Sequence, residues 1–311
     1  MKPYDEIFAE KPLRIVSRKS QLAMAQTDIV TGQLGGIAHE IIGVSTSGDE
    51  VLDRPLVDIG GKGVFIKSLE MMMIQGKADA AVHSFKDMET MLAEGTSLCA
   101  VLEREDRRDA LVGPHQTIDA LPDGSVIGTS SVRRAALLRH LRPDLEIALL
   151  RGNVQRRLSL LEEGQYDAII LAMAGLKRLG LSHLGHPLDE AEFMPSACQG
   201  AIAIQITDQD ASRKQAMTDA FARLHCEKTA IATKAERALL AQLDGSCRTP
   251  IGAMADVHDD GTVTLTGCVL SLDGVHKFDG TATARHDEAE ALGRQVADDL
   301  LQKCGGRSFL A

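Results

Sequence analysis

Cys247 is the residue with the clearest potential for covalent chemistry, because it lies in a short stretch bounded by Gly, Ser and Pro. Apolar residues at helical spacing precede this stretch, and a strand pattern over 251–257 follows it. Gly245 ends the helical pattern, and Pro250 prevents the chain from resuming it. Arg248 follows the cysteine directly and favours its thiolate form. The pattern predicts a reactive cysteine on a loop, although a loop cysteine without a function has the same pattern.

Basic and hydroxyl side chains recur directly after the predicted strands of the first 180 residues. In open α/β sheets ligands bind beyond the carboxyl ends of the strands, and helix N-termini there bind anions. The first helical turn disfavours cations, so a series of arginines at such positions indicates an anion-binding cleft. Carboxylate and phosphate are not separated by this argument. The side chains concerned belong to Arg18, Ser20, Lys86, Asp87, Thr129, Ser130, Ser131, Arg133, Arg134, Arg151, Arg157 and Arg178.

Asp87 is the one carboxylate among these cations. It could pair with Lys86 or an arginine for structural reasons alone. It could equally stabilise a developing positive charge or transfer a proton. The nearby His83 has the pattern of a hydrogen-bonded structural residue at a strand end. The Gly-rich run at 60–63 lacks the glycine and the hydroxyl residue of a nucleotide-binding loop, which argues against a nucleotide ligand.

Alternating strand and helix patterns must position these residues, and they predict parallel sheets with helices on both faces. A long loop over 47–63 has the length of a functional loop. A charged segment over 103–109 is interpreted as a crossing between domains, and the strand at 201–206 as a return to the first sheet. The predicted strands of this part cover 13–17, 40–46, 78–82, 98–102, 126–128, 145–150, 168–172 and 201–206.

From about residue 225 the pattern changes to one helix, three strands at 251–257, 262–270 and 275–284, and a closing helix. Short Asp-Gly turns join the strands, which predicts an antiparallel sheet. The fold class is therefore α/β, with two doubly wound domains and a small α+β C-terminal domain. The predicted boundaries are 1–103 with 200–222 for the first domain, 104–199 for the second and 223–311 for the third.

Composition excludes several classes of function. The net charge of −10 and the aromatic content of 3% argue against nucleic-acid binding. No apolar run has the length of a signal peptide or a membrane span. The six cysteines are scattered without a Cys-x-x-Cys pair, so neither a disulfide framework nor a zinc site is expected. A cytoplasmic protein without metal is the expectation.

Seven motifs together resemble the porphobilinogen deaminase family, and the resemblance extends over nearly the whole chain. It implies two periplasmic-binding-protein-like domains and a transferase of tetrapyrrole (haem) biosynthesis, hydroxymethylbilane synthase. Such enzymes carry a dipyrromethane cofactor, attached by a thioether to a cysteine that is Cys247 here. They join four porphobilinogen molecules head to tail with loss of ammonia, and then release hydroxymethylbilane by hydrolysis. The motifs lie at 17–23, 60–65, 81–87, 128–134, 151–153, 174–180 and 245–247.

The resemblance also assigns roles to residues, with Asp87, Lys86 and Arg18 as the catalytic group. Asp87 would stabilise cationic intermediates and transfer protons. The loop over 47–63 would be a lid, with Lys62 inside it and Phe65 just after it as lid residues. The protein is expected to act as a monomer without metal. The resemblance implies that the cofactor is bound by Cys247, Lys86, Asp87, Thr129, Ser130, Ser131, Arg133, Arg134, Arg151 and Gly152. It implies that the substrate is bound by Arg18, Ser20, Gln26, Arg151, Arg157 and Arg178.

Four positions depart from the family's pattern, namely Gln21, Asp58, Cys198 and Gln205, where proline, lysine, glycine and glutamate are frequent. Two other functions are compatible with parts of the sequence. One is a non-catalytic anion-binding protein, which has no use for Cys247. The other is an enzyme that uses Cys247 as a nucleophile in every turnover, which predicts a free thiol.

Overall fold

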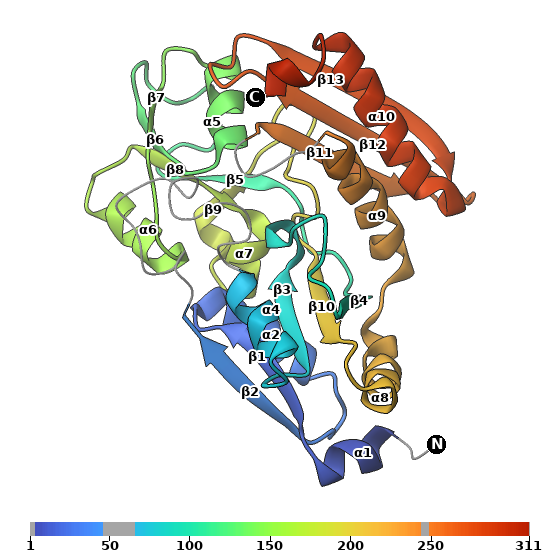
Figure 1. Cartoon of the computed structure of the whole chain (residues 1–311). Helices are drawn as coiled ribbons and strands as arrows, with labels where there is room; N and C mark the ends of the chain where they lie inside the picture. Colours follow the sequence, from blue (N-terminus) through green and yellow to red (C-terminus); the bar gives the residue numbers. More distant parts are fainter. Residues whose placement is uncertain (1–3, 46–65, 244–248, 311) are drawn as a thin grey trace. The chain divides into compact units, whose positions relative to one another are not determined.

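The computed structural model describes residues 4–45, 66–243 and 249–310 (Figure 1). Their backbone contacts form two compact units. The first unit contains 4–45, 66–105 and 201–230, and the second contains 106–200 together with the described residues from 231 onward. The second α/β sheet and the C-terminal α+β segment therefore belong to one compact unit. The division into three domains stays a prediction.

The first unit is built on a five-stranded sheet with the order β2-β1-β3-β10-β4. β1 is parallel to both β2 and β3, whereas β10 is antiparallel to β3 and β4. The predicted return of the chain to the first sheet is confirmed by β10, but the expectation of a wholly parallel sheet is wrong at this strand. The strands are β1 (Leu13–Arg18), β2 (His39–Val44), β3 (Ala80–Ser84), β4 (Thr96–Val101) and β10 (Ile202–Thr207).

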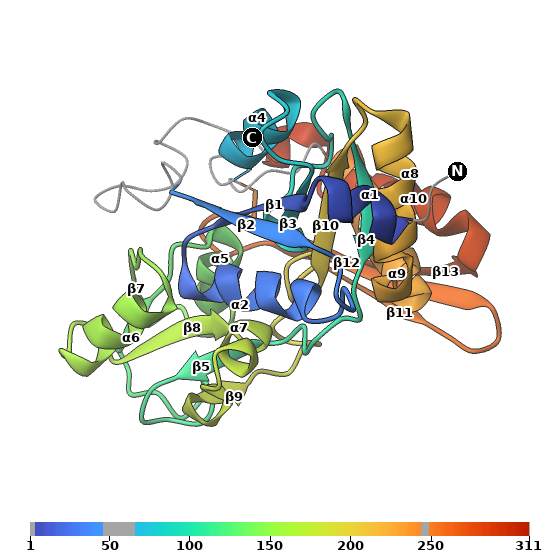
Figure 2. The ribbon, with the colours of Figure 1, turned by 90° about the horizontal axis from the view of Figure 1, so that it is seen from below.

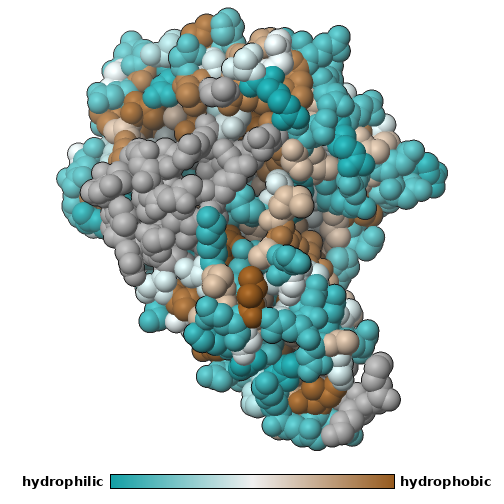
Figure 3. Space-filling model, viewed as in Figure 1, coloured by the Kyte–Doolittle hydropathy of each residue, from teal (hydrophilic) through white to brown (hydrophobic). Residues whose placement is uncertain are grey.

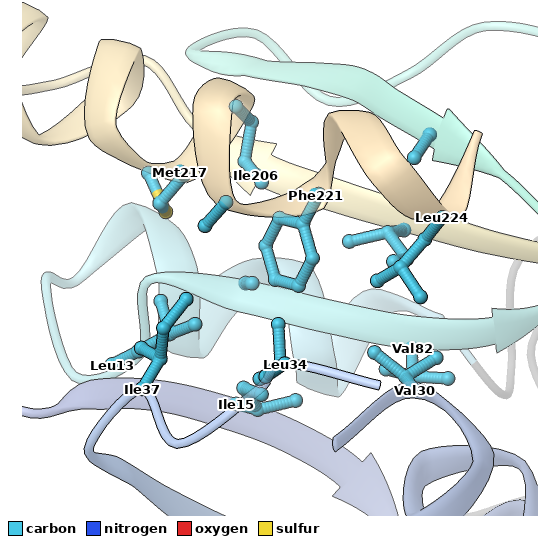
Figure 4. Close-up of a cluster of buried hydrophobic side chains, with 14 of the residues drawn as sticks. Leu13, Ile15, Val30, Leu34, Ile37, Val82, Ile206, Met217, Phe221 and Leu224 are labelled. Carbon is cyan, nitrogen blue, oxygen red and sulfur yellow. The ribbon is translucent and has the colours of Figure 1, made fainter. Parts of the chain in front are cut away.

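Helices cover both faces of the first sheet. Val30 of α2 (Gln21–Thr31) and Phe221 of α8 (Ala211–Phe221) share one buried cluster with Ile15 and Val82 of the sheet (Figure 4). α4 (Lys67–Ile74) packs on the opposite face, and Figure 2 shows α2 and α4 on opposite sides of β1. The central strands β3 and β10 are buried along almost their whole length, so their side chains fill both faces. The remaining helical segments are α1 (Tyr4–Glu10), η2 (Phe85–Asp87) and η4 (Ala222–Leu224).

The second unit contains a sheet of the same design, with the order β7-β6-β8-β5-β9 and with β5 antiparallel to its neighbours β8 and β9. Sequence reasoning missed β5, because the charged segment that precedes it was interpreted as a crossing between domains. It also missed the edge strand β9, which has only three residues. The strands are β5 (Asp109–Val112), β6 (Val126–Gly128), β7 (Glu146–Ala148), β8 (Ala168–Ala172) and β9 (Gly185–Pro187). The helical segments are α5 (Val132–Leu141), α6 (Val154–Glu162), α7 (Met173–Arg178) and η3 (Ser182–Leu184).

The C-terminal segment forms the predicted antiparallel sheet, with the order β11-β12-β13. Leu239 and Val296, from the two long helices, pack with Leu265 of this sheet in one apolar core. The expected fold class, α/β with a small antiparallel sheet at the C-terminal end, is confirmed. The elements are α9 (Glu227–Gln242), β11 (Ile251–Val257), β12 (Thr262–Leu270), β13 (Lys277–Arg285), η5 (His286–Glu288), α10 (Ala289–Lys303) and η6 (Arg307–Leu310).

Cys198 is the one non-glycine residue with a positive φ in the part of the chain that the structure describes, at 59°. Its backbone N–H donates to the buried Glu236 carboxylate at 2.6 Å, and this contact fixes the strained conformation. A Cβ atom in the left-handed region costs about 1 kcal/mol, which explains why glycine suits this position.

We expect Cys198→Gly to change the free energy of unfolding by less than about 1 kcal/mol, because relief of strain offsets the loss of the buried thiol. Cys198→Val should cost about 2 kcal/mol or more, since a β-branched side chain fits the left-handed region least. Urea unfolding of both variants measures the difference. Equal stabilities would contradict the strain argument.

No helix among the described residues is long and apolar enough to cross a membrane. On the face shown in Figure 3, apolar residues occur in small groups between hydrophilic ones. The most exposed large apolar side chain of the described residues is Met91, at 80%.

Candidate active site

Two neighbouring strands of the first unit end at the predicted catalytic residues. β1 ends at Arg18, and the parallel strand β3 leads directly into η2, which contains Lys86 and Asp87. β1 and β3 are neighbours in the first sheet (Figure 1). The carboxyl ends of parallel strands meet at one edge of a sheet. Nη1 of Arg18 lies 3.9 Å from Oδ2 of Asp87, and 21% and 29% of the two side chains are exposed. The structure therefore brings a partly exposed carboxylate and a guanidinium together, with Lys86 next to them in the sequence.

The same edge contains Ser20 and Gln26, which were predicted to bind substrate. Ser20 is the N-cap of α2, and its hydroxyl accepts the N–H of Ala23 at 3.4 Å. Gln26 is buried, and its Oε1 accepts a hydrogen bond from the hydroxyl of Ser84 at 2.9 Å. Ser84 was missed by sequence reasoning, although its place at the end of β3, directly before η2, was a usable signal.

In the second unit, β6 leads into a turn of hydroxyl residues and then into α5. The Thr129 hydroxyl accepts the N–H of Ser131 at 3.1 Å, and Ser131 is the N-cap that accepts the N–H of Arg134 at 3.4 Å. Ser130 lies between them and is partly exposed. These bonds fix the turn that was predicted to bind anions, at the N-terminus of a ten-residue helix.

Arg133 and Arg134 extend into the core of the second unit, where Asp109 is completely buried. Nη2 of Arg133 donates to one carboxylate oxygen at 2.8 Å, and Nη2 of Arg134 donates to the other at 2.6 Å. Each guanidinium also donates to a backbone carbonyl, that of Met194 or of Ile170. These contacts are structural, so a role of the two arginines in binding the cofactor stays a prediction.

Asp109 is held as a carboxylate by its neighbours. Burial alone would raise the pKa of Asp109, but the charges of Arg133 and Arg134 outweigh burial and hold that pKa well below its usual range. Gln199 adds a hydrogen bond to the carboxylate at 2.9 Å. Sequence reasoning missed Asp109, because its place at the end of a run of charges gave no sign that it would be buried.

The turn between β7 and α6 holds the next predicted group. Arg151 is only 7% exposed, and Gly152 has a φ of 107°, which a side chain would rarely adopt. The Gly152 carbonyl accepts from Nε of Arg157 at 2.9 Å. Asn153 caps α6 by accepting the N–H of Arg156 at 2.9 Å, a role that the sequence analysis did not assign. Arg157, near the start of α6, is thus bonded to the turn that holds Arg151 and Gly152.

Arg178, the last residue of α7, donates from Nη2 to the carbonyl of Gly200 at 2.6 Å. The predicted residues Cys247, Lys62 and Phe65 lie outside the described residues, as does the loop over 47–63. α9 ends at Gln242 before the cysteine stretch and β11 begins at Ile251 after it, as the sequence predicts.

An open hollow of about 600 Å³ lies in the second unit, and none of the predicted site residues lines it. Its cations are already paired, Arg107 with Glu190 at 2.9 Å and Arg108 with Asp106 at 2.7 Å. Within residues 4–45, 66–243 and 249–310, no three His, Cys, Asp or Glu side chains gather into a group that could hold a metal ion. The strand ends, rather than this hollow, therefore carry the candidate chemistry.

Two family models match the chain. The model described as "Porphobilinogen deaminase, dipyromethane cofactor binding domain" matches residues 13–215, which is more than half of the chain. The model described as "Porphobilinogen deaminase, C-terminal domain" matches residues 230–302.

A curated porphobilinogen deaminase from Chromobacterium violaceum is 46% identical to this chain over 303 residues, which are 96% of each chain. Among solved structures, the periplasmic VFT2 domain of BvgS from Bordetella pertussis is 16% identical, with 73% of this chain and 94% of that chain covered and a TM-score of 0.41. An amino acid ABC transporter substrate-binding protein from Streptococcus pneumoniae, bound to L-arginine, is 13% identical, with 72% and 92% covered and a TM-score of 0.39. The family models and the curated relative show that the chain belongs to the porphobilinogen deaminase family, and it is therefore a transferase of tetrapyrrole biosynthesis that uses a dipyrromethane cofactor.

Proposed function

We propose that Asp87, Lys86 and Arg18 are the residues with which this chain joins four porphobilinogen molecules to its cofactor, and that Cys247 holds the cofactor by a thioether. The observation that carries the proposal is the Arg18–Asp87 ion pair at the carboxyl ends of β1 and β3. One partly exposed carboxylate among cations suits a reaction in which an acidic substrate develops positive charge.

The described residues fit a cofactor of this kind. Each pyrrole unit carries two carboxylates, and guanidinium, ammonium, hydroxyl and helix N-terminal groups are the donors that bind carboxylates in proteins. In the first unit these donors are supplied by Arg18, Lys86 and Ser20, and in the second by the turns before α5 and α6. When bound, the cofactor supplies the pyrrole carbon to which the first substrate molecule is joined.

Asp87 has two tasks in this proposal. Its carboxylate stabilises positive charge on the substrate as ammonia leaves, and it takes up the proton that the pyrrole ring loses when the new carbon–carbon bond has formed. Arg18, 3.9 Å away, orients the carboxylate, and Lys86 binds a carboxylate of the substrate or cofactor. Ser20 and Gln26 complete the substrate contacts of this strand edge.

The residues of the second unit act by binding carboxylates. Thr129, Ser130 and Ser131 present hydroxyls at the start of α5, and Arg151, Arg157 and Arg178 supply guanidiniums at the ends of strands and helices. Gly152 fixes the turn between Arg151 and Arg157. We further propose that the enzyme acts as a monomer in the cytoplasm without a metal ion.

Mass spectrometry of the intact purified protein tests the thioether. We expect the chain to be heavier than its sequence by two condensed pyrrole units, and peptide mapping should place this mass on Cys247. Cys247→Ser should lack the added mass, whereas Cys304→Ser, which changes a different cysteine with a partly accessible side chain, should keep it. A chain with no added mass, or with the mass on another residue, would refute the assignment.

A further inference from the structure

A buried polar pair lies next to the Arg18–Asp87 ion pair in the first unit. His83, the fourth residue of β3, is 3% exposed, and Gln205 of β10 is completely buried. Among the described residues, Nε2 of His83 and Oε1 of Gln205 lack a hydrogen-bond partner. Buried polar atoms without partners are costly, so their presence together calls for an explanation.

The strand register places this pair on the same face of the sheet as Arg18. Gln205 is opposite Ala81, and His83 follows Ala81 by two residues, so all three side chains share a face. In the parallel ladder Val16 is opposite Ala81, and Arg18 follows Val16 by two residues. Val16 and Ala81 pack in the cluster under α4. Arg18 and His83 are therefore neighbours at the strand ends, with Gln205 beneath them.

The amide of Gln205 has only one satisfactory orientation. Its nitrogen donates to the carboxylate of Glu70 on α4 at 3.0 Å and to the hydroxyl oxygen of Thr96 at 2.7 Å. The Thr96 hydroxyl itself donates to the carbonyl of Ala93 at 2.6 Å, so it can only accept from the amide. The amide oxygen is therefore left for His83. An oxygen can only accept, so the imidazole has to offer N–H at Nε2 and keeps Nδ1 unprotonated.

The charges around the ring favour its neutral form. Burial lowers the pKa of His83 to about 4; the Gln205 amide acts in the opposite direction, and the charge of Arg18 lowers the pKa further. The other charged groups near this strand end are Glu70, which faces the ring through Gln205, and the Lys86 and Asp87 side chains of η2. A protonated ring would repel the Arg18 guanidinium.

We propose that His83 is a positioning residue for the reaction, held by Gln205 as the neutral Nε2–H imidazole so that Arg18 keeps its orientation toward Asp87. The two buried atoms close into an Nε2–H···Oε1 hydrogen bond in the working enzyme, and Glu70 anchors the amide from the other side. His83 itself touches no reacting atom. The kinetic part of this inference rests on the proposed role of Asp87, whereas the tautomer does not.

The tautomer is tested on the holoenzyme labelled with ¹⁵N in histidine. Long-range ¹⁵N–¹H spectra distinguish the two tautomers, and the His83 signal is identified by its loss in His83→Gln. We expect the Nε2–H form, without titration between about pH 8 and pH 5.5, where an ordinary histidine becomes protonated. An Nδ1–H signal, or titration near the usual pKa, would overturn the proposal whether or not Asp87 is catalytic.

Gln205→Leu tests the consequence for the reaction. We expect kcat to fall about tenfold and KM to change less than about threefold, because a displaced strand end disturbs the geometry of the reacting groups more than it weakens substrate binding. The single tautomer should also be lost. Gln205→Glu restores an acceptor oxygen for the ring, so the Nε2–H form should return, with a higher pKa of the ring. It also replaces the nitrogen that donates to Glu70 and Thr96, so kcat should recover only in part.

Thr207→Val is the matched control for this pair of variants. Thr207 is a buried polar residue at the opposite end of β10, and its loss should leave kcat within about twofold of the parent. If Gln205→Leu lowers kcat no more than Thr207→Val does, His83 has no positioning role. If Asp87→Asn remains active while the His83 tautomer is as expected, the role of Asp87 fails and the structural inference stands.

Discussion

Asp87→Asn is expected to lower turnover by at least about 100-fold while the protein still folds and still carries its cofactor. The amide keeps the size of the side chain but can neither take up a proton nor offset positive charge. The side chain is 29% exposed, so its loss leaves no uncompensated charge in the core. Single-turnover and steady-state assays measure the effect, and the intact mass shows whether the cofactor is present.

Glu89→Gln is the matched control, because Glu89 is another partly exposed carboxylate two residues away. It should change turnover less than about threefold. If Asp87→Asn retains a tenth or more of the parent's activity with its cofactor in place, Asp87 is not the proton-transferring group. If it loses the cofactor and the activity together, Asp87 serves cofactor attachment before catalysis.

Periodicity and turn residues were sufficient to predict most of the fold. The carboxyl ends of β1 and β3 lie one and two residues beyond the ends that the apolar runs predicted, and this was close enough to bring Arg18 and Asp87 together. β5 could not be predicted in the same way. It has four residues and begins at a charged one, Asp109, so neither its length nor its composition distinguishes it from a loop.

The burial of Arg133 and Arg134 could not be predicted from the sequence. Both follow the N-cap Ser131 and resemble Arg151 and Arg157 in their place after a strand. Only a partner from another part of the chain, Asp109, decides that they turn inward. A long-range ion pair leaves no local signal, because its two halves are separated by 24 and 25 residues.

The two α/β sheets share one feature of their topology. In each, one strand runs antiparallel to its neighbours, and it is the strand that follows the passage of the chain from the other unit: β5 after 103–108 and β10 after Gly200. Gln199 precedes the second passage and binds both the Asp109 carboxylate and the carbonyl of Arg107. One buried carboxylate thus ties together the two segments of the second unit at which the chain enters and leaves.

For this reason we expect Asp109→Asn to lower the free energy of unfolding by about 3–5 kcal/mol, because it leaves two buried guanidiniums without a countercharge. Urea unfolding at pH 7 measures the loss. Asp123→Asn removes a carboxylate that is 97% exposed and paired with Arg142, so it should cost less than about 1 kcal/mol. A similar small loss for both variants would contradict the assignment of Asp109 as the anchor.

The parent protein and Asp109→Asn should also differ in how their free energies of unfolding change at acidic pH. Arg133 and Arg134 lower the pKa of Asp109 in the folded state, against the effect of burial, relative to about 3.9 in the unfolded chain. A lowered pKa contributes stability that is complete above the unfolded value and is lost as the pH falls below it toward the folded value. The stability difference between the parent and Asp109→Asn should therefore be constant from about pH 7 to pH 5 and shrink below about pH 4, because only the parent then has a carboxylate to protonate. A difference that stays constant down to about pH 3 would show that Asp109 does not carry the charge that holds the two arginines in the core.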